Sequence, residues 1–104
     1  MFGMSKKPKT PAELFYENRS KWIEEMFDHP DITHADFRVL YFIGRRSGFE
    51  NRGMYWTVPL IARRCQCSTH TVSAATTKAA KLGYLKVMQS PGKENFYSPV
   101  FYWL

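Results

Sequence analysis

The chain has 104 residues, of which 44% are hydrophobic and 16% are aromatic. This length and composition predict one compact domain and exclude an intrinsically disordered chain. No apolar run approaches the ~18 residues of a membrane span, and the basic start, residues 1–11, lacks the apolar stretch of a secretory signal. We therefore expect a cytoplasmic protein of a bacterium or a mobile element.

The formal net charge of +6 lies entirely in the second half of the chain. Residues 1–50 contain as many acidic as basic side chains, whereas residues 51–104 contain seven basic side chains and only one acidic one, Glu94. Such one-sided charge is typical of a protein that binds a polyanion. A basic surface without a specific ligand would explain the charge equally well, and the charge alone leaves both interpretations open.

Residues 1–9 are predicted to be a flexible basic arm, because a proline interrupts its lysines. A single domain is expected over residues 10–104. Its first helix is predicted over residues 10–28, because Thr10 and Glu13 have the spacing of a capping box. The apolar side chains of this helix form one stripe, which either packs on the rest of the domain or mediates a homodimer. The stripe consists of Leu14, Phe15, Trp22, Ile23, Met26 and Phe27.

A second helix is predicted over residues 33–44, with Thr33 as its N-cap and Asp36 in its first turn. A charged loop rich in turn residues follows, and then a short aromatic strand over residues 54–57. The side chains that we expect to face the core from the second helix are Phe37, Leu40, Tyr41 and Gly44.

Two further helices are predicted over residues 57–66 and 69–82. Thr57 and Ser68 are suitable N-caps, and Gly83 is a natural residue to follow the end of the second of these helices. The expected core positions are Leu60, Ile61 and Cys65 in the earlier helix, and Val72, Ala75, Thr76, Ala79 and Leu82 in the later one.

The last part of the chain is predicted to form a β-hairpin over residues 84–103. Two β-like segments, 84–88 and 95–103, flank a turn-forming segment at residues 90–93. Alternation along a strand would bury about half of its aromatic side chains. The others could form a subunit interface or stack on single-stranded bases. These aromatic residues are Phe96, Tyr97, Phe101, Tyr102 and Trp103.

The join at residues 66–68 has the features of a helix-turn-helix. Such a motif needs a small residue where the two helices cross, and Ala62 fits this place. Cys67 can anchor the turn in the core, and Ser68 and Thr69 can cap the second helix and donate to phosphate. The two helices are therefore predicted to present the later one to DNA.

The segment TVPLIARRCQCSTHTVSAATTKAAKLGYLKV resembles the winged helix-turn-helix of bacterial and plasmid transcriptional regulators and replication initiators. The resemblance covers residues 32–103 and implies an α+β fold: a three-helix core and a β-hairpin wing, here with an extra N-terminal helix. The chain departs from the pattern at Cys65, Gln66 and Ala79. It matches the pattern at Ile61, Ala62, Arg64, Cys67, Ser68, Thr71, Val72, Leu82, Gly83 and Leu85.

The resemblance implies a set of DNA-binding residues. The outer face of the helix over 69–82 carries no arginine, the strongest reader of guanine, so we expect modest sequence specificity. The basic arm could add a loose contact through Lys6, Lys7 and Lys9. The resemblance implies that Thr69, His70, Ser73, Thr77 and Lys78 face the major groove, that Arg63, Arg64, Ser68 and Lys81 meet phosphates, and that Lys93 and Asn95 at the wing tip reach a minor groove or the backbone.

Metal binding and catalysis are not expected. Cys65, Cys67 and His70 suggest a metal site, but a closed zinc site needs four ligands, and cysteines that anchor a core cannot also share an ion. His29 and His34 lie in a helix-capping loop, where histidines are usually structural or exposed. The sequence contains no recognisable catalytic set and no phosphate-binding glycine loop. We therefore predict a non-enzymatic protein without cofactor or metal.

The function predicted from the sequence is that of a transcriptional regulator that binds double-stranded DNA. Because no effector domain fits in 104 residues, we expect a repressor that occludes a promoter or origin, as a homodimer formed through the N-terminal helix. The alternative is a protein–protein interaction module in a plasmid replication or conjugative transfer complex. Neither hypothesis involves a membrane.

Overall fold

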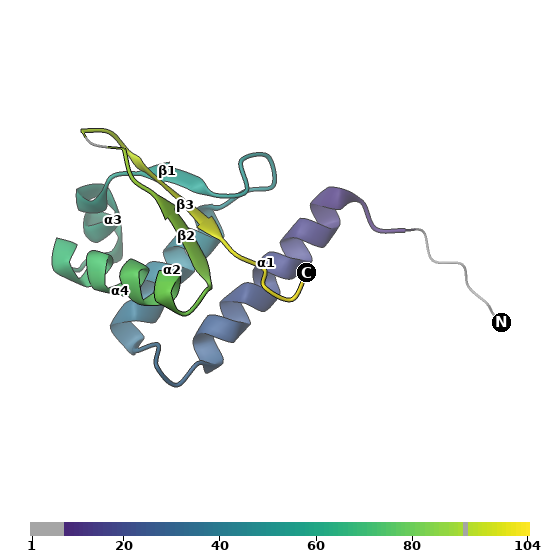
Figure 1. Ribbon diagram of the computed structural model, residues 1–104, viewed down its shortest axis with the longest axis horizontal. Coiled ribbons are helices and arrows are strands. Elements are labelled where there is room, and N and C mark those ends of the chain that lie inside the picture. Colours follow the sequence, from purple (N-terminus) through teal and green to yellow (C-terminus); the bar gives the residue numbers. More distant parts are fainter. Residues whose placement is uncertain (1–7, 91) are drawn as a thin grey trace.

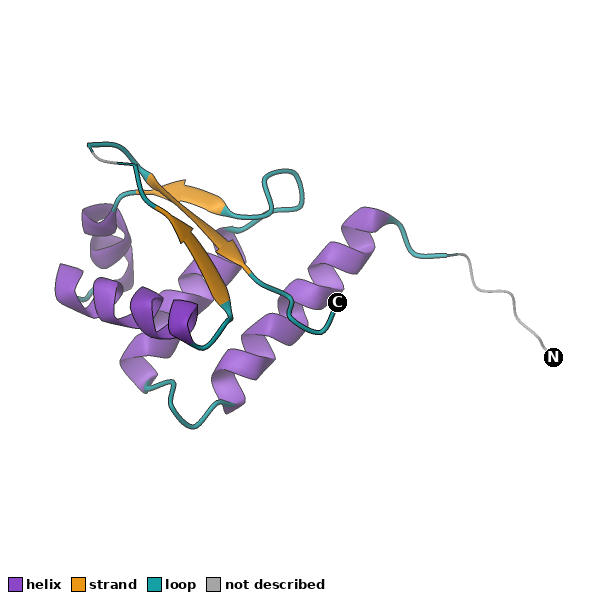
Figure 2. Ribbon diagram, in the orientation of Figure 1, coloured by secondary structure: helices purple, strands orange, loops and turns teal. Residues whose placement is uncertain are grey.

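The described part of the computed structural model, residues 8–90 and 92–104, forms four helices and a three-stranded antiparallel sheet (Figures 1 and 2). This α+β arrangement confirms the predicted winged helix-turn-helix fold with an extra N-terminal helix. Most of the predicted basic arm, with Lys6 and Lys7, lies outside the described residues. The elements in chain order are α1 (Pro11–Asp28), α2 (His34–Arg46), β1 (Met54–Trp56), α3 (Val58–Cys65), α4 (Thr69–Lys81), β2 (Leu85–Met88) and β3 (Asn95–Pro99).

Each helix begins at a side chain that accepts a hydrogen bond from the first turn. Thr10 and Thr33 form complete capping boxes at the starts of α1 and α2. Thr57 accepts from the backbone N–H of Leu60 at the start of α3, and Ser68 caps α4 in the same way. These bonds satisfy backbone donors that have no partner inside the helix, which is why the caps mark the starts.

The predicted end of the hairpin, residue 103, is wrong. The second strand was expected to reach Trp103, but β3 ends at Pro99, which pairs with Leu85 as the last position of the ladder. Beyond it the chain turns towards α1, where the indole Nε1 of Trp103 donates to Asn18 Oδ1 at 2.7 Å. Figure 1 shows the C-terminus beside α1. The terminal aromatic residues therefore pack on the first helix instead of extending the wing.

The sheet has the strand order β1-β3-β2, so that β3 lies in the middle. Tyr97 on β3 is 1% exposed and is aligned with both Met54 and Val87. The position just before β1 is occupied by Gly53 and has no room for a side chain, because a Cβ there would lie 2.4 Å from the carbonyl oxygen of Tyr97. One face of the sheet is buried against the helices, and β2 and β3 form the hairpin.

α1 packs on its own domain. Trp22 is fully buried, and its Nε1 donates to the carbonyl oxygen of Tyr84 at 2.8 Å. Gly44 of α2 lies against this indole, since a Cβ there would be 2.9 Å from Trp22 Cζ3. The predicted apolar stripe is too wide, because Leu14 is 45% and Phe27 66% exposed. The fully buried face of α1 consists of Phe15, Trp22 and Met26, and Ile23 packs against the core while partly buried.

Three other predicted core positions are also wrong. Tyr41, Leu60 and Leu82, the C-cap residue of α4, are all exposed. On α2, Val39 and Ile43 are fully buried in place of Tyr41, because the face of this helix that meets α4 is rotated from the expected one. The buried residues of α2, α3 and α4 otherwise form one continuous core with the sheet.

Candidate nucleic-acid interface

The turn between α3 and α4 is tightly bonded. Gln66 has φ 58° and ψ 48°, a left-handed conformation that glycine usually occupies. Its conformation allows the N–H of Cys67 to donate to the carbonyl oxygen of Ala62 at 3.0 Å. Ser68 then caps α4 by accepting from the N–H of Thr71 at 3.1 Å. The turn therefore holds the two helices at a fixed angle even though a glutamine stands in the turn.

The inner face of α4 consists of small side chains that allow close packing on α2. Ala75 and Ala79 are fully buried, and Thr76 satisfies its buried hydroxyl by donating to the carbonyl oxygen of Val72 at 3.0 Å. The outer face contains exposed side chains without a large apolar group: Thr69, His70, Ser73, Ala74, Thr77, Ala80 and Lys81.

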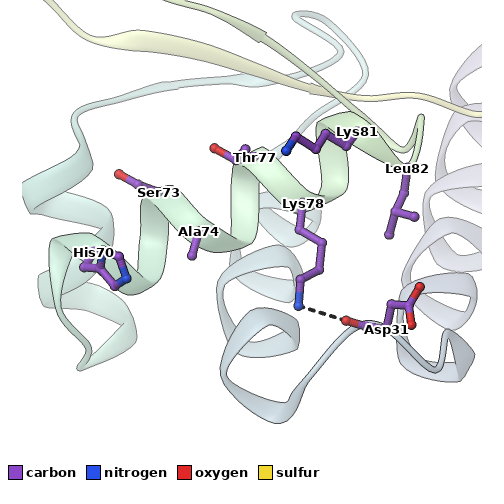
Figure 3. A pocket seen from close by; sticks show the side chains of 8 residues that line it. All are labelled: Asp31, His70, Ser73, Ala74, Thr77, Lys78, Lys81 and Leu82. Atoms are coloured by element: carbon purple, nitrogen blue, oxygen red, sulfur yellow. Dashed lines mark hydrogen bonds between the residues drawn. The ribbon is translucent and has the colours of Figure 1, made fainter.

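A shallow groove of about 760 Å³ runs along this outer face (Figure 3). It brings together five of the residues that the resemblance implied as DNA contacts. Figure 3 shows Ser73, Thr77 and Lys81 along one edge of α4, and Ala74 and Lys78 along the other. The lining residues are Asp31, His70, Ser73, Ala74, Thr77, Lys78, Lys81 and Leu82.

Two smaller grooves continue from α4 to the wing. The first, of about 340 Å³, lies between Thr77 and Lys81 on α4 and Val87 and Gln89 of the hairpin. The second, of about 480 Å³, lies between the hairpin tip and the start of α3. Thr77 and Lys81 also line the groove along α4, and Gln89 lines both smaller grooves. The three grooves therefore form one continuous surface, which we call the recognition surface.

The wing tip contains the two predicted residues in this second groove. Lys93 is exposed, whereas Asn95 is half-buried and donates through Nδ2 to the hydroxyl of Tyr97 at 3.1 Å. Gln89 and Thr57 also line the groove, and neither was predicted to contact DNA. The sequence places Gln89 beside the predicted turn and Thr57 at a predicted N-cap. It does not indicate that the hairpin tip lies close to the start of α3.

Lys78 is turned towards its own domain. Its Nζ lies 2.5 Å from Asp36 Oδ2 and donates to the carbonyl oxygen of Asp31 at 2.9 Å (Figure 3). Burial opposes ionisation of Asp36, but hydrogen bonds from Lys78 and Thr33 outweigh it, so the pKa of this carboxyl lies below its ordinary value. Lys78 thus joins α4 to the start of α2, 42 residues away.

The two arginines of α3 are both exposed, but Arg64 is separated from the recognition surface. Its guanidinium lies 5.4 Å from the ring centre of Phe42 and 5.9 Å from that of Trp56. It lines a different groove, to which α4 contributes no residue. The structure thus brings His70, Ser73, Thr77, Lys78 and Lys81 together along α4 and places Arg64 elsewhere.

The cysteines have core surroundings. Cys65 is buried, and its thiol donates to the carbonyl oxygen of Arg38 at 3.9 Å. Burial raises the pKa of the Cys65 thiol, and the neighbouring Cys67 adds to this rise.

His29 accepts a hydrogen bond at Nδ1 from the N–H of Asp31 at 3.0 Å. Within residues 8–90 and 92–104, no three His, Cys, Asp or Glu side chains are arranged to hold a metal ion.

None of the described helices is both long enough and apolar enough to cross a bilayer. Comparison with protein families matches residues 31–85 to the family described as a helix-turn-helix domain, a DNA-binding module. No curated protein and no solved structure matches the chain significantly. The matched segment contains α2, α3 and α4 and is just over half of the chain, so the protein belongs to the helix-turn-helix domain family.

Proposed function

We propose that this protein is a non-enzymatic transcriptional regulator, a repressor, that binds duplex DNA through the recognition surface. The observation that carries the proposal is the continuous groove from the outer face of α4 to the wing tip. α4 begins with a capped, exposed turn and has no large apolar side chain on its outer face, so it suits insertion into a major groove with its N-terminal end leading.

Base reading is assigned to hydroxyl and imidazole groups. His70, Ser73 and Thr77 are exposed and lie along α4 at spacings of three or four residues, so they share one face. Thr69 lies one residue before His70 in the same first turn. The absence of arginine, asparagine and glutamine from this face predicts modest discrimination between bases, because these are the side chains that make bidentate contacts with base edges.

Phosphate binding supplies most of the affinity in this proposal. The exposed cations that line the recognition surface are Lys81 on α4 and Lys93 at the wing tip, and Arg63 on α3 is exposed as well. Ser68 can offer its hydroxyl at the positive end of α4. Lys78 acts as a positioning residue, because its ammonium group is bonded to Asp36 and orients α4 for the other side chains.

Repression by occlusion needs no element beyond the bound domain itself. Binding as a homodimer would match a two-fold operator. Since Trp22 is buried within its own domain, such a dimer would use the exposed apolar residues of α1, Leu14 and Phe27. Two free cysteines fit the reducing cytoplasm, and a plasmid or another mobile element is the proposed genetic setting.

Selection of bound sites from randomised duplexes tests the proposal. The native chain should enrich a short motif, and His70→Ala should relax the preference at one base pair while leaving the others. Lys81→Ala should weaken binding to all sequences alike and reduce the salt slope by about 1. Lys86→Ala is the matched control, because Lys86 is exposed on β2 outside the recognition surface.

The opposite result would refute the DNA proposal. If no duplex is retained even at low salt, the recognition surface does not bind DNA. An interaction module of a replication or transfer complex would then remain as the alternative hypothesis.

A further inference from the structure

A second basic surface lies on α2 and α3, outside the recognition surface. It is a groove of about 490 Å³ lined by four arginines and two aromatic residues. Neither α4 nor the hairpin contributes a residue to it. We call it the arginine groove, and it is lined by Arg38, Tyr41, Phe42, Arg45, Arg46, Arg64 and Cys65.

Three of the four guanidinium groups lie over aromatic rings and not beside carboxylates. Arg46 and Arg64 each lie 5.4 Å from the ring centre of Phe42, and Arg45 lies 6.0 Å from that of Tyr41. The two ion pairs within the described residues are those of Lys9 with Glu17 and of Lys78 with Asp36, and neither involves this groove. The positive charge of the groove is therefore not neutralised by the described part of the chain.

One of the arginines has a structural role that explains how the groove is built. Arg38 donates through Nε to the carbonyl oxygen of Cys65 at 2.6 Å and through Nη2 to Gln66 Oε1 at 3.4 Å. It thereby bonds α2 to the C-terminal end of α3. Within residues 8–90 and 92–104, the other three guanidinium groups donate no hydrogen bond to the protein, so their donors are available to a ligand.

We propose that the arginine groove is a second binding site for the phosphate backbone of a nucleic acid. Planar guanidinium groups bind phosphate through paired hydrogen bonds, and gathering four of them costs electrostatic repulsion that a polyanion offsets. Tyr41 is 45% exposed at the same place and offers a ring for a sugar or base.

The inference goes beyond the function proposed above, since two separate backbone sites would let one chain hold two nucleic-acid segments at once. Duplex and single-stranded DNA share the phosphate chemistry, and the experiment distinguishes them. It uses two labelled probes: a duplex of about ten base pairs, one helical turn, and an oligothymidylate of the same length. The number of probes bound per chain is measured at low salt by native mass spectrometry.

Three variants of the full chain isolate the groove. Arg45→Gln/Arg46→Gln removes two charges from it. Lys21→Gln/Lys86→Gln removes two charges from exposed positions outside all of these grooves. Ser73→Glu/Thr77→Glu places negative charge on the recognition surface. All six substituted side chains are exposed, so each variant should keep the fold, which circular dichroism checks.

The native chain is expected to bind two probes, and the arginine variant one. The arginine variant should lose roughly tenfold or more in affinity for the probe that occupies the groove. For a duplex, its salt slope should fall by about 1.8, the contribution of two phosphates. If only the oligothymidylate shows this loss, the ligand of the groove is single-stranded DNA. If the duplex shows it, the groove binds duplex.

Two results would overturn the inference. One is an arginine variant that binds both probes as the lysine control does. The other comes from a parallel measurement with a labelled polyglutamate peptide: if the groove binds this peptide in an arginine-dependent way but neither DNA probe, it is a site for an acidic protein segment. The recognition surface fails separately: if Ser73→Glu/Thr77→Glu leaves probe binding intact while the arginine variant weakens it, the proposed function is refuted and the arginine groove stands.

Discussion

The ion pair between Lys78 and Asp36 gives a quantitative prediction about stability. Lys78→Met keeps the aliphatic stem but removes the charge, and leaves a carboxylate whose side chain is only 8% exposed without its cation. An exposed pair stabilises by about 0–1 kcal/mol, whereas breaking a buried one costs about 3–5 kcal/mol. Because the Lys78 side chain is 36% exposed, we expect a loss between these limits, about 1–2 kcal/mol.

A double-mutant cycle with Asp36→Asn measures this interaction. The asparagine keeps an oxygen that can accept from the N–H of Thr33, so the change isolates the charge. Urea unfolding of the four proteins should give a coupling energy of about 1 kcal/mol. In thermal unfolding, the Tm of Lys78→Met should fall by roughly 4–8 °C per kcal/mol of lost stability. A coupling energy of zero, together with an unchanged free energy of unfolding in Lys78→Met, would refute the positioning role. Lys78 would then again be expected to face the major groove.

Three further predictions concern the same core. The free energy of unfolding should fall as the pH drops below 3.8, the ordinary carboxyl pKa, because the ionised carboxylate of Asp36 stabilises the fold and its pKa is lowered in the folded state. Urea unfolding across pH should show a smaller loss in Asp36→Asn. Gly44→Ala should destabilise by about 1–2 kcal/mol, because overpacking against Trp22 exceeds the gain in helix propensity; a more stable variant would contradict the close contact. Trp22→Phe should cost about 1–3 kcal/mol in the same assay, through lost volume and the lost bond to Tyr84, and an unchanged midpoint would show that α1 is not docked.

The helices of the recognition surface could be predicted because their signals are local. Thr57 and Ser68 mark the starts of α3 and α4, and the small buried residues of α4 recur with helical spacing. The outer face of α4 follows directly from that spacing. The positions of His70, Ser73 and Thr77 on one groove are consequently visible in the sequence.

The contacts between distant segments could not be predicted in this way. Nothing local to Lys78 indicates that its partner is Asp36, and nothing local to Arg64 indicates that it lies with the arginines of α2. Both depend on how α2 packs against the helix-turn-helix. The end of β3 was missed for a similar reason, since the terminal aromatic residues alternate like a strand but bond to α1 instead.

The central claim is that the outer face of α4 binds duplex DNA, and affinity for a selected duplex as a function of salt tests it most directly. Ser73→Glu/Thr77→Glu puts two negative charges on this face, and Ser20→Glu/Asn51→Glu adds the same charge at exposed positions outside the recognition surface and the arginine groove. The α4 variant should bind at least roughly tenfold more weakly than this control at low salt, and the difference should narrow as the salt concentration rises. Equal affinities of the two variants would contradict the claim.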